Sequence, residues 1–227
     1  TGALGHIGSY VTRDLARQFP QMSVMMIDNM MTQRYSSLFD LPATGRYRFI
    51  EGDVRSLDLR SLFKDAHTVI HLAAITDAAG SFDKAAQVKP TNYEGTEKVA
   101  EACVETGARL ISLSSTSVYG TQKQEVSEDC SPEELKPQSP YAHTKLKEES
   151  LVTGLHKDKS LKAVCCRFGT IVGASPGMRF HTAVNKFCWQ AAMGQAITVW
   201  KTAYDQQRPY LDLVDAARAI SFLIRTD

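Results

Sequence analysis

Residues 1–9 read Thr1-Gly2-Ala3-Leu4-Gly5-His6-Ile7-Gly8-Ser9, with a glycine at every third position, and an amphipathic helical pattern follows over Ile7–Gln18. Glycine lets another group approach the backbone closely, and a helix N-terminus offers free N–H donors with a partial positive charge. Both properties suit a pyrophosphate. On spacing alone a purely structural turn is an alternative, so the stretch predicts a phosphate-binding turn only together with its context.

That context is an acidic residue at the end of an apolar run. Asp28 lies twenty positions beyond Gly8 and ends the predicted strand Met22–Asp28. A carboxylate at this point of a βαβ unit binds the ribose hydroxyls of an adenosine. It also repels a 2′-phosphate, and the neighbouring Asn29 has no charge to receive one. The pattern therefore favours NAD over NADP as the cofactor.

Short apolar runs alternate with longer helical segments along the chain, which is typical of a parallel α/β sheet. The predicted strands are Met22–Asp28, Tyr47–Glu51, His67–Ala73, Arg109–Ser114 and Leu161–Phe168, and the predicted helices are Ile7–Gln18, Ser56–Lys64, Thr91–Glu105 and Pro140–Leu155. A polar segment with two prolines, Gly120–Gln138, predicts a long surface loop. The expected fold is a Rossmann-like α/β fold with a doubly wound parallel sheet.

The order of elements changes after Gly169. A loop is expected at Ser175–Gly177, followed by a helix near His181–Met193, strands Ile197–Trp200 and Tyr210–Val214, and a last helix. We therefore expect residues 1–168 to form an NAD-binding Rossmann domain whose first strand is missing. Residues 169–227 are expected to form part of a smaller C-terminal substrate lobe, interleaved with the end of the first domain. The chain begins inside a turn and ends in a helical pattern, as expected of a fragment.

Composition excludes several function classes. The 227 residues carry a formal net charge of +1 without a basic stripe, which argues against nucleic acid or an anionic membrane surface as a partner. The apolar runs are too short to span a bilayer. The five cysteines lack metal-ligand spacing, so we predict no metal site and idle thiols in a reducing, cytoplasmic location.

A tyrosine and a lysine supply the expected chemistry. Tyr141 and Lys145 lie four residues apart on one face of the helix that begins at Pro140, with Ser139 as its N-cap. A free phenol has a pKa of about 10, too high for a base at neutral pH. A nearby ammonium and an oxidised nicotinamide both favour the phenolate and lower that pKa. A surface tyrosine beside a solvated lysine is the alternative on spacing alone.

A hydroxyl-rich strand end decides between these two interpretations. Residues 113–120 read Leu-Ser-Ser-Thr-Ser-Val-Tyr-Gly and follow the predicted strand Arg109–Ser114. Hydroxyls at the carboxyl end of a parallel strand lie where ligands bind in open α/β sheets. Ser115 is the favoured substrate-orienting hydroxyl, with Thr116 as the alternative.

The combined motifs resemble the extended short-chain dehydrogenase/reductase family, in particular its NAD-dependent nucleotide-sugar epimerase/dehydratase branch. Each is weak alone, but together they span nearly the whole chain in the family's order. They are Thr1–Gly8, Asp28-Asn29, Gly52-Asp53-Val54, His71-Leu72-Ala73-Ala74, Asn92-x-x-Gly95-Thr96, Ser115-x-x-Val118-Tyr119-Gly120, Ser139-Pro140-Tyr141-x-x-x-Lys145 and Arg208-Pro209-Tyr210 through Asp215.

The resemblance implies a role for each matching residue. A cofactor set would hold NAD: Gly2, Gly5 and Gly8 at the pyrophosphate, Asp28 with Asn29 at the ribose, Asp53 and Val54 beside the adenine, and Leu72, Ala73 and Ala74 along the cleft. Tyr141 would be the acid/base and Lys145 its tuner, which also hydrogen-bonds the nicotinamide ribose. A substrate set would comprise Ser115, Thr116, Thr170 and Arg208, the last at the phosphates of a sugar nucleotide.

The implied first step is shared by most of this branch: a phenolate removes a hydroxyl proton while hydride passes to NAD, giving a keto-sugar. Resembling dehydratases and decarboxylases have an acidic residue just before Val-Tyr-Gly, where this chain has Thr116 and Ser117. That departure favours an epimerase, with a reductase or dehydrogenase as the alternative. Thr170 stands where UDP-galactose 4-epimerases have asparagine, and Gly173–Asn185 resembles epimerases of surface-polysaccharide biosynthesis.

Two other functions are less favoured, and one quaternary structure is expected. A non-catalytic NAD-binding member is disfavoured by the intact Tyr141/Lys145 pair. A reductase of steroid- or flavonoid-like substrates would need an apolar substrate lobe, whereas Arg179 and Arg208 suggest phosphate. The resemblance also implies a homodimer in which Thr91–Glu105 and Pro140–Leu155 pair as a four-helix bundle.

Overall fold

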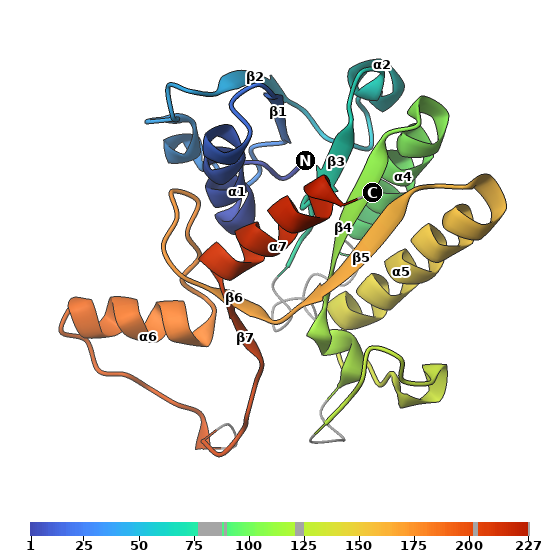
Figure 1. The fold of residues 1–227 in the computed structure, drawn as a ribbon. Coiled ribbons are helices and arrows are strands. Elements are labelled where there is room, and N and C mark those ends of the chain that lie inside the picture. The colour runs from blue at the N-terminus through green and yellow to red at the C-terminus, as the bar shows by residue number, and fades with distance from the viewer. Residues whose placement is uncertain (77–87, 89, 121–124, 202–203, 227) are drawn as a thin grey trace.

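Helices cover both faces of a set of parallel strands in the computed structural model (Figure 1). The structure describes residues 1–227 except 77–87, 89, 121–124, 202–203 and 227. Part of the predicted Gly120–Gln138 loop, residues 121–124, therefore lies outside the described residues. The predicted Rossmann-like α/β fold is confirmed.

All strand pairs of the described residues are parallel. β1 pairs with β2, β4 lies between β3 and β5, and β6 pairs with β7. The bounds are Ser23–Asp28 (β1), Arg46–Glu51 (β2), Thr68–His71 (β3), Arg109–Ser115 (β4), Ala163–Phe168 (β5), Thr170–Val172 (β6) and Tyr210–Asp212 (β7). β1 to β5 and β7 were predicted, although β3, β5 and β7 are shorter than expected.

The helices also follow the predicted order. Their bounds are His6–Gln18 (α1), Leu59–Phe63 (α2), Gly95–Thr106 (α4), Pro140–Lys159 (α5), Ala183–Ala192 (α6) and Leu213–Arg225 (α7). Two predicted starts are wrong. Asp58 caps α2 by accepting from the Ser61 N–H, so this helix begins after it and not at Ser56. A π-helical turn, Pro90–Glu94, replaces the first part of the helix expected from Thr91.

Side chains of β4 alternate between two apolar layers, which identifies the sheet as the centre of the molecule. Leu110 faces a core shared with α2, α4 and α5, whereas Ile111 and Leu113 face a core shared with α1 and α7. Successive side chains of a strand point to opposite faces, so this alternation requires apolar cover on both sides. The carboxyl ends of the strands are thereby left as the free edge of the sheet.

The glycine-rich turn lies between β1 and β3 at this carboxyl edge. The Thr1 amine donates to the Ile70 carbonyl (2.8 Å), and the Ala3 N–H donates to the Ile27 carbonyl (3.3 Å). The expected strand upstream of Thr1 is not part of this chain and stays a prediction.

The last third of the chain leaves the sheet and then returns to it. β6, α6 and β7 project from the sheet, and α7 packs back against α1 (Figure 1). The predicted strand Ile197–Trp200 is wrong, because these residues are unpaired and Trp200 is 77% exposed. Alternating apolar residues form a strand only where a neighbouring strand offers hydrogen bonds. The domain boundary at residues 168/169 stays a prediction.

The described residues contain neither a membrane-spanning helix nor a metal-binding group. Among the helices described, none has the length and apolarity needed to cross a bilayer. Within the same ranges, no group of three or more His, Cys, Asp or Glu side chains is arranged to hold a metal ion. The five cysteines are free thiols, and Cys103 and Cys166 are buried.

Candidate active site

The three glycines of the turn have different surroundings. Gly2 has a φ of +66°, and a Cβ there would lie 2.5 Å from the Ala73 nitrogen. A Cβ on Gly8 would lie 2.3 Å from the Gly2 carbonyl oxygen, so the helix could not pack against the turn. A Cβ on Gly5 would lie 3.4 Å from the Gly2 carbonyl oxygen, and no other described atom would be closer. Gly2 and Gly8 therefore serve packing, whereas Gly5 keeps open space above the turn.

Asp28 fixes the turn to the end of β1. Its carboxylate accepts hydrogen bonds from the Leu4 N–H and the Met30 N–H, both at 3.0 Å. Each carboxylate oxygen has a second lone pair, so Asp28 is still able to accept from a ribose hydroxyl. The predicted ribose-binding residue therefore also orients the phosphate-binding turn.

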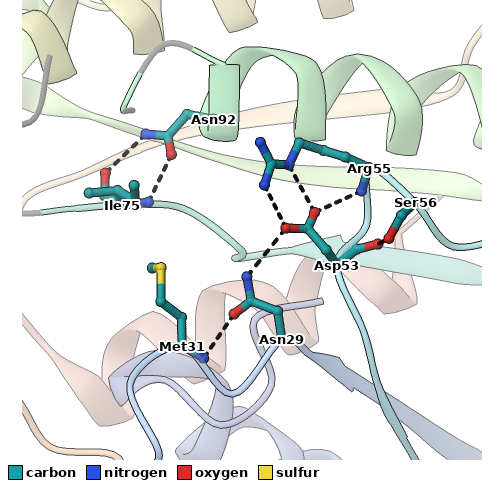
Figure 2. A network of polar contacts seen from close by, with 7 residues as sticks. All are labelled: Asn29, Met31, Asp53, Arg55, Ser56, Ile75 and Asn92. Atoms are coloured by element: carbon teal, nitrogen blue, oxygen red, sulfur yellow. Dashed lines mark hydrogen bonds and ion pairs between the residues drawn. The ribbon is translucent and has the colours of Figure 1, made fainter. Parts of the chain in front are cut away.

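A polar network follows β1 and β2 on the same edge (Figure 2). Arg55 binds the Asp53 carboxylate at 2.7 Å, and Asn29 donates a hydrogen bond to it at 3.5 Å. These contacts, the hydrogen bond from the Arg55 side chain first, lower the pKa of Asp53 to about 2. Asp53 and Asn29, both predicted to contact the cofactor, are thus brought together, and Asp53 is ionised at neutral pH.

The chain beyond β3 passes beneath the turn, as the predicted cleft residues require. The Leu72 N–H donates to the Thr1 carbonyl oxygen (3.1 Å), and Ala73 lies against Gly2. Asn92 then holds Ile75 with two hydrogen bonds of 2.8 and 2.9 Å (Figure 2). Ala74 lies between these two fixed points and is half-buried.

Val54 is buried in the core between β1 and α4. Its side chain lies 3.3 Å from the position of a Cβ on Gly95. Packing against α4 is therefore its contact in this structure. Its predicted place beside the adenine stays a prediction.

The local sequence places Tyr141 at the start of α5, on its buried face. Ser139 caps the helix by accepting from the Ala142 N–H (3.1 Å), and Pro140 occupies the first turn, as predicted. Tyr141 is 9% exposed, and its hydroxyl is hydrogen-bonded to the Ser115 side chain. Ser115 ends β4 and caps a short 3₁₀ turn, Thr116–Tyr119. The structure thus joins two residues predicted to act together, and Ser115 contacts the phenol.

The pKa of Tyr141 differs from the expectation. Burial of the ring raises it, and the charge of Lys145 and the Ser115 hydrogen bond only partly offset this effect. Lys145 therefore acts in the predicted direction, but desolvation outweighs it. The phenol is protonated at neutral pH in the protein alone, so a further positive charge is needed to ionise it.

Lys145 is buried rather than solvated, and it has an unexpected partner. Its Nζ lies 2.8 Å from Glu148 Oε2 and 5.9 Å from the centroid of the Tyr141 ring. Burial opposes the ammonium charge, but Glu148 and Tyr141 hold the pKa of Lys145 above its ordinary value. The surface-pair alternative is thereby excluded. Sequence analysis missed Glu148, although its spacing of three from Lys145 places both on one helix face.

A second buried carboxylate, Glu149, ties α5 to the strands. Arg167 of β5 binds it with contacts of 2.7 and 3.0 Å, and the Ser114 hydroxyl also donates to it. Arg167 also donates to the Tyr119 hydroxyl at 3.0 Å. This network fixes the helix that carries Tyr141 against the end of β4.

Two arginines near the turn were not assigned to the cofactor from the sequence. Arg34 is half-buried, its Nη1 lies 3.9 Å from the position of a Cβ on Gly5, and its charge interacts with Asp28. No hydrogen bond joins its guanidinium to another described residue. Arg179 donates to Thr76, and its charge helps burial to lower the pKa of His6 and partly offsets the rise that burial causes in the pKa of Tyr141. Arg179 is therefore close enough to interact with both His6 and Tyr141.

The segment after β6 covers the turn. Ser175 is hydrogen-bonded to His6 (2.8 Å), and the Gly177 N–H donates to the Ser9 hydroxyl (3.0 Å). A Cβ on Gly177 would lie 2.3 Å from the Leu4 carbonyl oxygen. Burial, together with the charge of Arg179, lowers the pKa of His6 to about 4, so this histidine is neutral.

Thr170 and Arg208, two predicted substrate residues, are not brought to Tyr141 by any contact of the described residues. Thr170 begins β6, and its N–H donates to the Pro209 carbonyl oxygen (2.9 Å). Arg208 is exposed, and its guanidinium donates to Gln206 (3.1 Å). Their roles toward a sugar nucleotide stay predictions.

The turn fits the expected dinucleotide. Gly5 leaves space that a single methyl group would fill, and the unpaired N–H groups of the first helical turn face the same region. Arg34 adds a positive charge there, and Asp28 offers the ribose an acceptor. These four features match two phosphates followed by a ribose.

Comparison with known proteins identifies a family and relatives of this chain. The NAD dependent epimerase/dehydratase family matches residues 1–227. A trifunctional UDP-glucose 4,6-dehydratase/UDP-4-keto-6-deoxy-D-glucose 3,5-epimerase/UDP-4-keto-L-rhamnose-reductase of Arabidopsis thaliana is 28% identical over 99% of this chain and 34% of its own length. A UDP-glucose 4-epimerase of Streptomyces lividans is 27% identical over 99% of the chain and 70% of its own length.

A solved structure gives the same result for the fold. A mutant of the UDP-glucuronic acid 4-epimerase of Bacillus cereus, in complex with UDP-4-deoxy-4-fluoro-glucuronic acid and NAD, is 29% identical. The two structures superpose with a TM-score of 0.90, and the match covers 100% of this chain and 72% of the epimerase chain. The chain thus spans about a third of the length of the first relatives it matches, and about 70% of others. It belongs to the NAD dependent epimerase/dehydratase family, the extended short-chain dehydrogenase/reductase branch that its motifs resemble.

Proposed function

We propose that this protein is an NAD-dependent epimerase of a nucleotide-activated sugar. The observation that carries the proposal is the Tyr141 hydroxyl, which is buried, hydrogen-bonded to Ser115 and close to the Lys145 ammonium. It lies at the carboxyl edge of the sheet, which also holds the glycine-rich turn. Relatives named as UDP-sugar epimerases and solved with NAD support the assignment.

The chain's own residues would share the work as follows. Gly5 and the first turn of α1 receive the pyrophosphate, and Asp28 accepts from the adenosine ribose. When bound, the oxidised nicotinamide adds a positive charge and accepts a hydride that it later returns. Ser115 orients the reacting sugar hydroxyl, and Tyr141 as phenolate takes the proton of that hydroxyl. Lys145 stabilises the phenolate, and Tyr141 gives the proton back after the carbonyl has presented its other face.

Epimerisation is favoured over dehydration because elimination of water needs a second acid or base. The turn after Ser115 has Thr116 and Ser117 where a carboxylate would serve, and Glu149 is engaged by Arg167. The alternative is a reductase or dehydrogenase that uses the same Tyr141 chemistry once. A non-catalytic NAD-binding protein would not require a buried tyrosine held by Ser115.

The test is incubation of the protein with UDP-, GDP-, dTDP- and CDP-sugars, with and without added NAD, followed by NMR of the sugar. Inversion of one carbon without net NADH is the expected result. Stoichiometric NADH would show a dehydrogenase, and a keto-deoxy-sugar would show a dehydratase. Tight NAD binding without turnover of any sugar nucleotide would contradict the proposal and favour a non-catalytic role.

Arg34 is proposed to bind the cofactor pyrophosphate, because its guanidinium lies beside Gly5 and has no hydrogen-bond partner among the described residues. Arg34→Ala is expected to raise the Kd for NAD about tenfold or more, since a hydrogen bond to a charged group contributes about 1.5–3 kcal/mol. Isothermal titration calorimetry measures the change. Arg17→Ala, an exposed arginine in the last turn of α1, should leave the Kd within about twofold. Equal Kd values for wild type and Arg34→Ala would contradict this role.

We also propose a homodimer and a cytoplasmic location. α4 and α5 lie side by side on one face of the sheet (Figure 1), and the resemblance implies that they pair with a second copy. Sedimentation velocity tests this, and a single monomeric species at micromolar concentration would contradict it. The free thiols fit a reducing compartment. A role in polysaccharide biosynthesis would follow from the identity of the sugar.

A further inference from the structure

The buried carboxylate of Glu148 is not used by the mechanism above. Tyr141, Lys145 and Glu148 are spaced by four and then three residues, so all three lie along one buried face of α5. The side chains of Lys145 and Glu148 are only 5% and 3% exposed, and their charged atoms lie 2.8 Å apart. A buried lysine beside a catalytic phenol is therefore already neutralised by a neighbour on its own helix.

Glu148 also has an incompletely satisfied carboxylate. Oε2 accepts from Lys145, whereas Oε1 is buried and has no hydrogen-bond partner among the described residues. A buried acceptor without a partner is destabilising, so packing alone does not account for a glutamate at this position. The same volume could be filled by an apolar side chain without that penalty.

The groups that interact with Lys145, Glu148 or Tyr141 come from five elements. On α5 there is Tyr141, on β3 His71, on β4 Ser115, on β5 Cys165, and after β6 Arg179. Burial, helped by Lys145, keeps the pKa of His71 well below its ordinary value, and burial raises the pKa of Cys165 to about 12. Both are neutral near pH 7, and Glu149 is compensated by Arg167. Glu148 is therefore the counter-ion of Lys145.

We propose that Glu148 is a positioning residue for the Tyr141–Lys145 pair: it anchors the Lys145 ammonium and, by neutralising it, restrains ionisation of Tyr141 until the cofactor's positive charge arrives. This inference rests on the proposed function for its catalytic meaning. Its physical content, an anion on Lys145 that keeps the phenol protonated, applies to the protein without cofactor or substrate. The charge of Glu148 acts on Tyr141 in this direction.

Glu148→Gln tests the proposal, because the amide keeps an acceptor for Lys145 while removing the charge. Ionisation of Tyr141 should then shift to lower pH by about one unit, since the ammonium acts on the phenol without compensation. The first readout is ultraviolet difference titration of tyrosinate in the cofactor-free protein. Subtracting the corresponding Tyr141→Phe protein isolates Tyr141. In turnover, the acidic limb of the kcat/KM–pH profile should move the same way, because the base form is the active one.

Glu149→Gln is the matched control, with the same substitution one residue further along α5. It breaks the contact with Arg167 and should lower thermal stability, but the midpoint of Tyr141 should stay within about 0.3 units. If Glu148→Gln fails to fold, Glu148→Asp keeps the anion but withdraws it by one methylene group. The midpoint should then fall by less than one unit.

An unchanged or higher Tyr141 midpoint in the Glu148 variants would overturn the proposal. The titration needs neither NAD nor a sugar nucleotide. A shifted midpoint in a protein that turns over no sugar would therefore support the role of Glu148 while rejecting the epimerase function. An active epimerase whose Tyr141 midpoint does not shift in Glu148→Gln would support the epimerase function and reject the role of Glu148.

Discussion

Tyr141→Phe is expected to lower kcat by about 10³-fold or more while leaving NAD bound. The substitution removes one oxygen, the atom that exchanges a proton with the sugar, and a general acid/base contributes about 10²–10⁴-fold to a rate. The ring still fills its buried site, and the loss of the Ser115 hydrogen bond costs about 1 kcal/mol of folding free energy. Kinetics on the sugar found in the substrate panel give kcat, and calorimetry gives the Kd for NAD.

Tyr10→Phe is the control for this prediction. Tyr10 lies on α1 and packs with the apolar layer of α7, away from the Ser115–Tyr141 contact. Its variant should keep kcat within about twofold. A Tyr141→Phe enzyme that retains more than a tenth of wild-type kcat would mean that another group moves the proton, and the mechanism would have to be abandoned.

Alanine at Gly5 and at Gly8 is expected to give opposite defects. At Gly8 the new methyl group would lie 2.3 Å from the Gly2 carbonyl oxygen and 2.8 Å from Ala3 backbone atoms. Backbone has to move, so the free energy of unfolding should fall by about 2–3 kcal/mol or more, with Tm lower by roughly 5–10 °C. At Gly5 the methyl group meets nothing closer than 3.4 Å, and the fold should keep nearly wild-type stability.

The Gly5→Ala defect should instead be in binding. The methyl group fills the space into which the pyrophosphate fits, so the Kd for NAD should rise by about a hundredfold, from steric exclusion and lost backbone contacts. Thermal denaturation and calorimetry separate the two defects. Gly154→Ala is the comparison within α5, where the added Cβ would meet no described atom within 4 Å. This variant should raise the free energy of unfolding by about 0.5–1 kcal/mol.

The opposite pattern would refute this division of roles. A stable Gly8→Ala protein would mean that Gly8 is not needed for packing of the turn, and a Gly5→Ala protein that binds NAD normally would mean that Gly5 does not leave room for the pyrophosphate. Both variants add the same single carbon, and helix propensity favours alanine at Gly8, inside α1, over alanine at Gly5, its N-cap, which is opposite to the expected difference in stability.

The sequence was a sufficient guide at several points where a local rule governs structure, although it missed Asp58 as the N-cap of α2. Ser139 and Pro140 begin α5 because capping depends on neighbours in the chain. The same holds for the end of β1 at Asp28 and for the common helix face of Tyr141 and Lys145. The strand expected at Ile197–Trp200 failed because strand formation depends on a partner that the pattern does not reveal.

Sequence alone therefore determined the order of strands and helices, the glycine-rich turn, and the Tyr141–Lys145 pair with its nearby hydroxyls. Only the tertiary structure decided which charges surround that pair. It brings Arg34 to Gly5, places Arg179 within interaction range of His6 and Tyr141, and buries Glu148 against Lys145. The physical reason is that electrostatic energy depends on distance and burial, which residue spacing fixes only within one helix or strand.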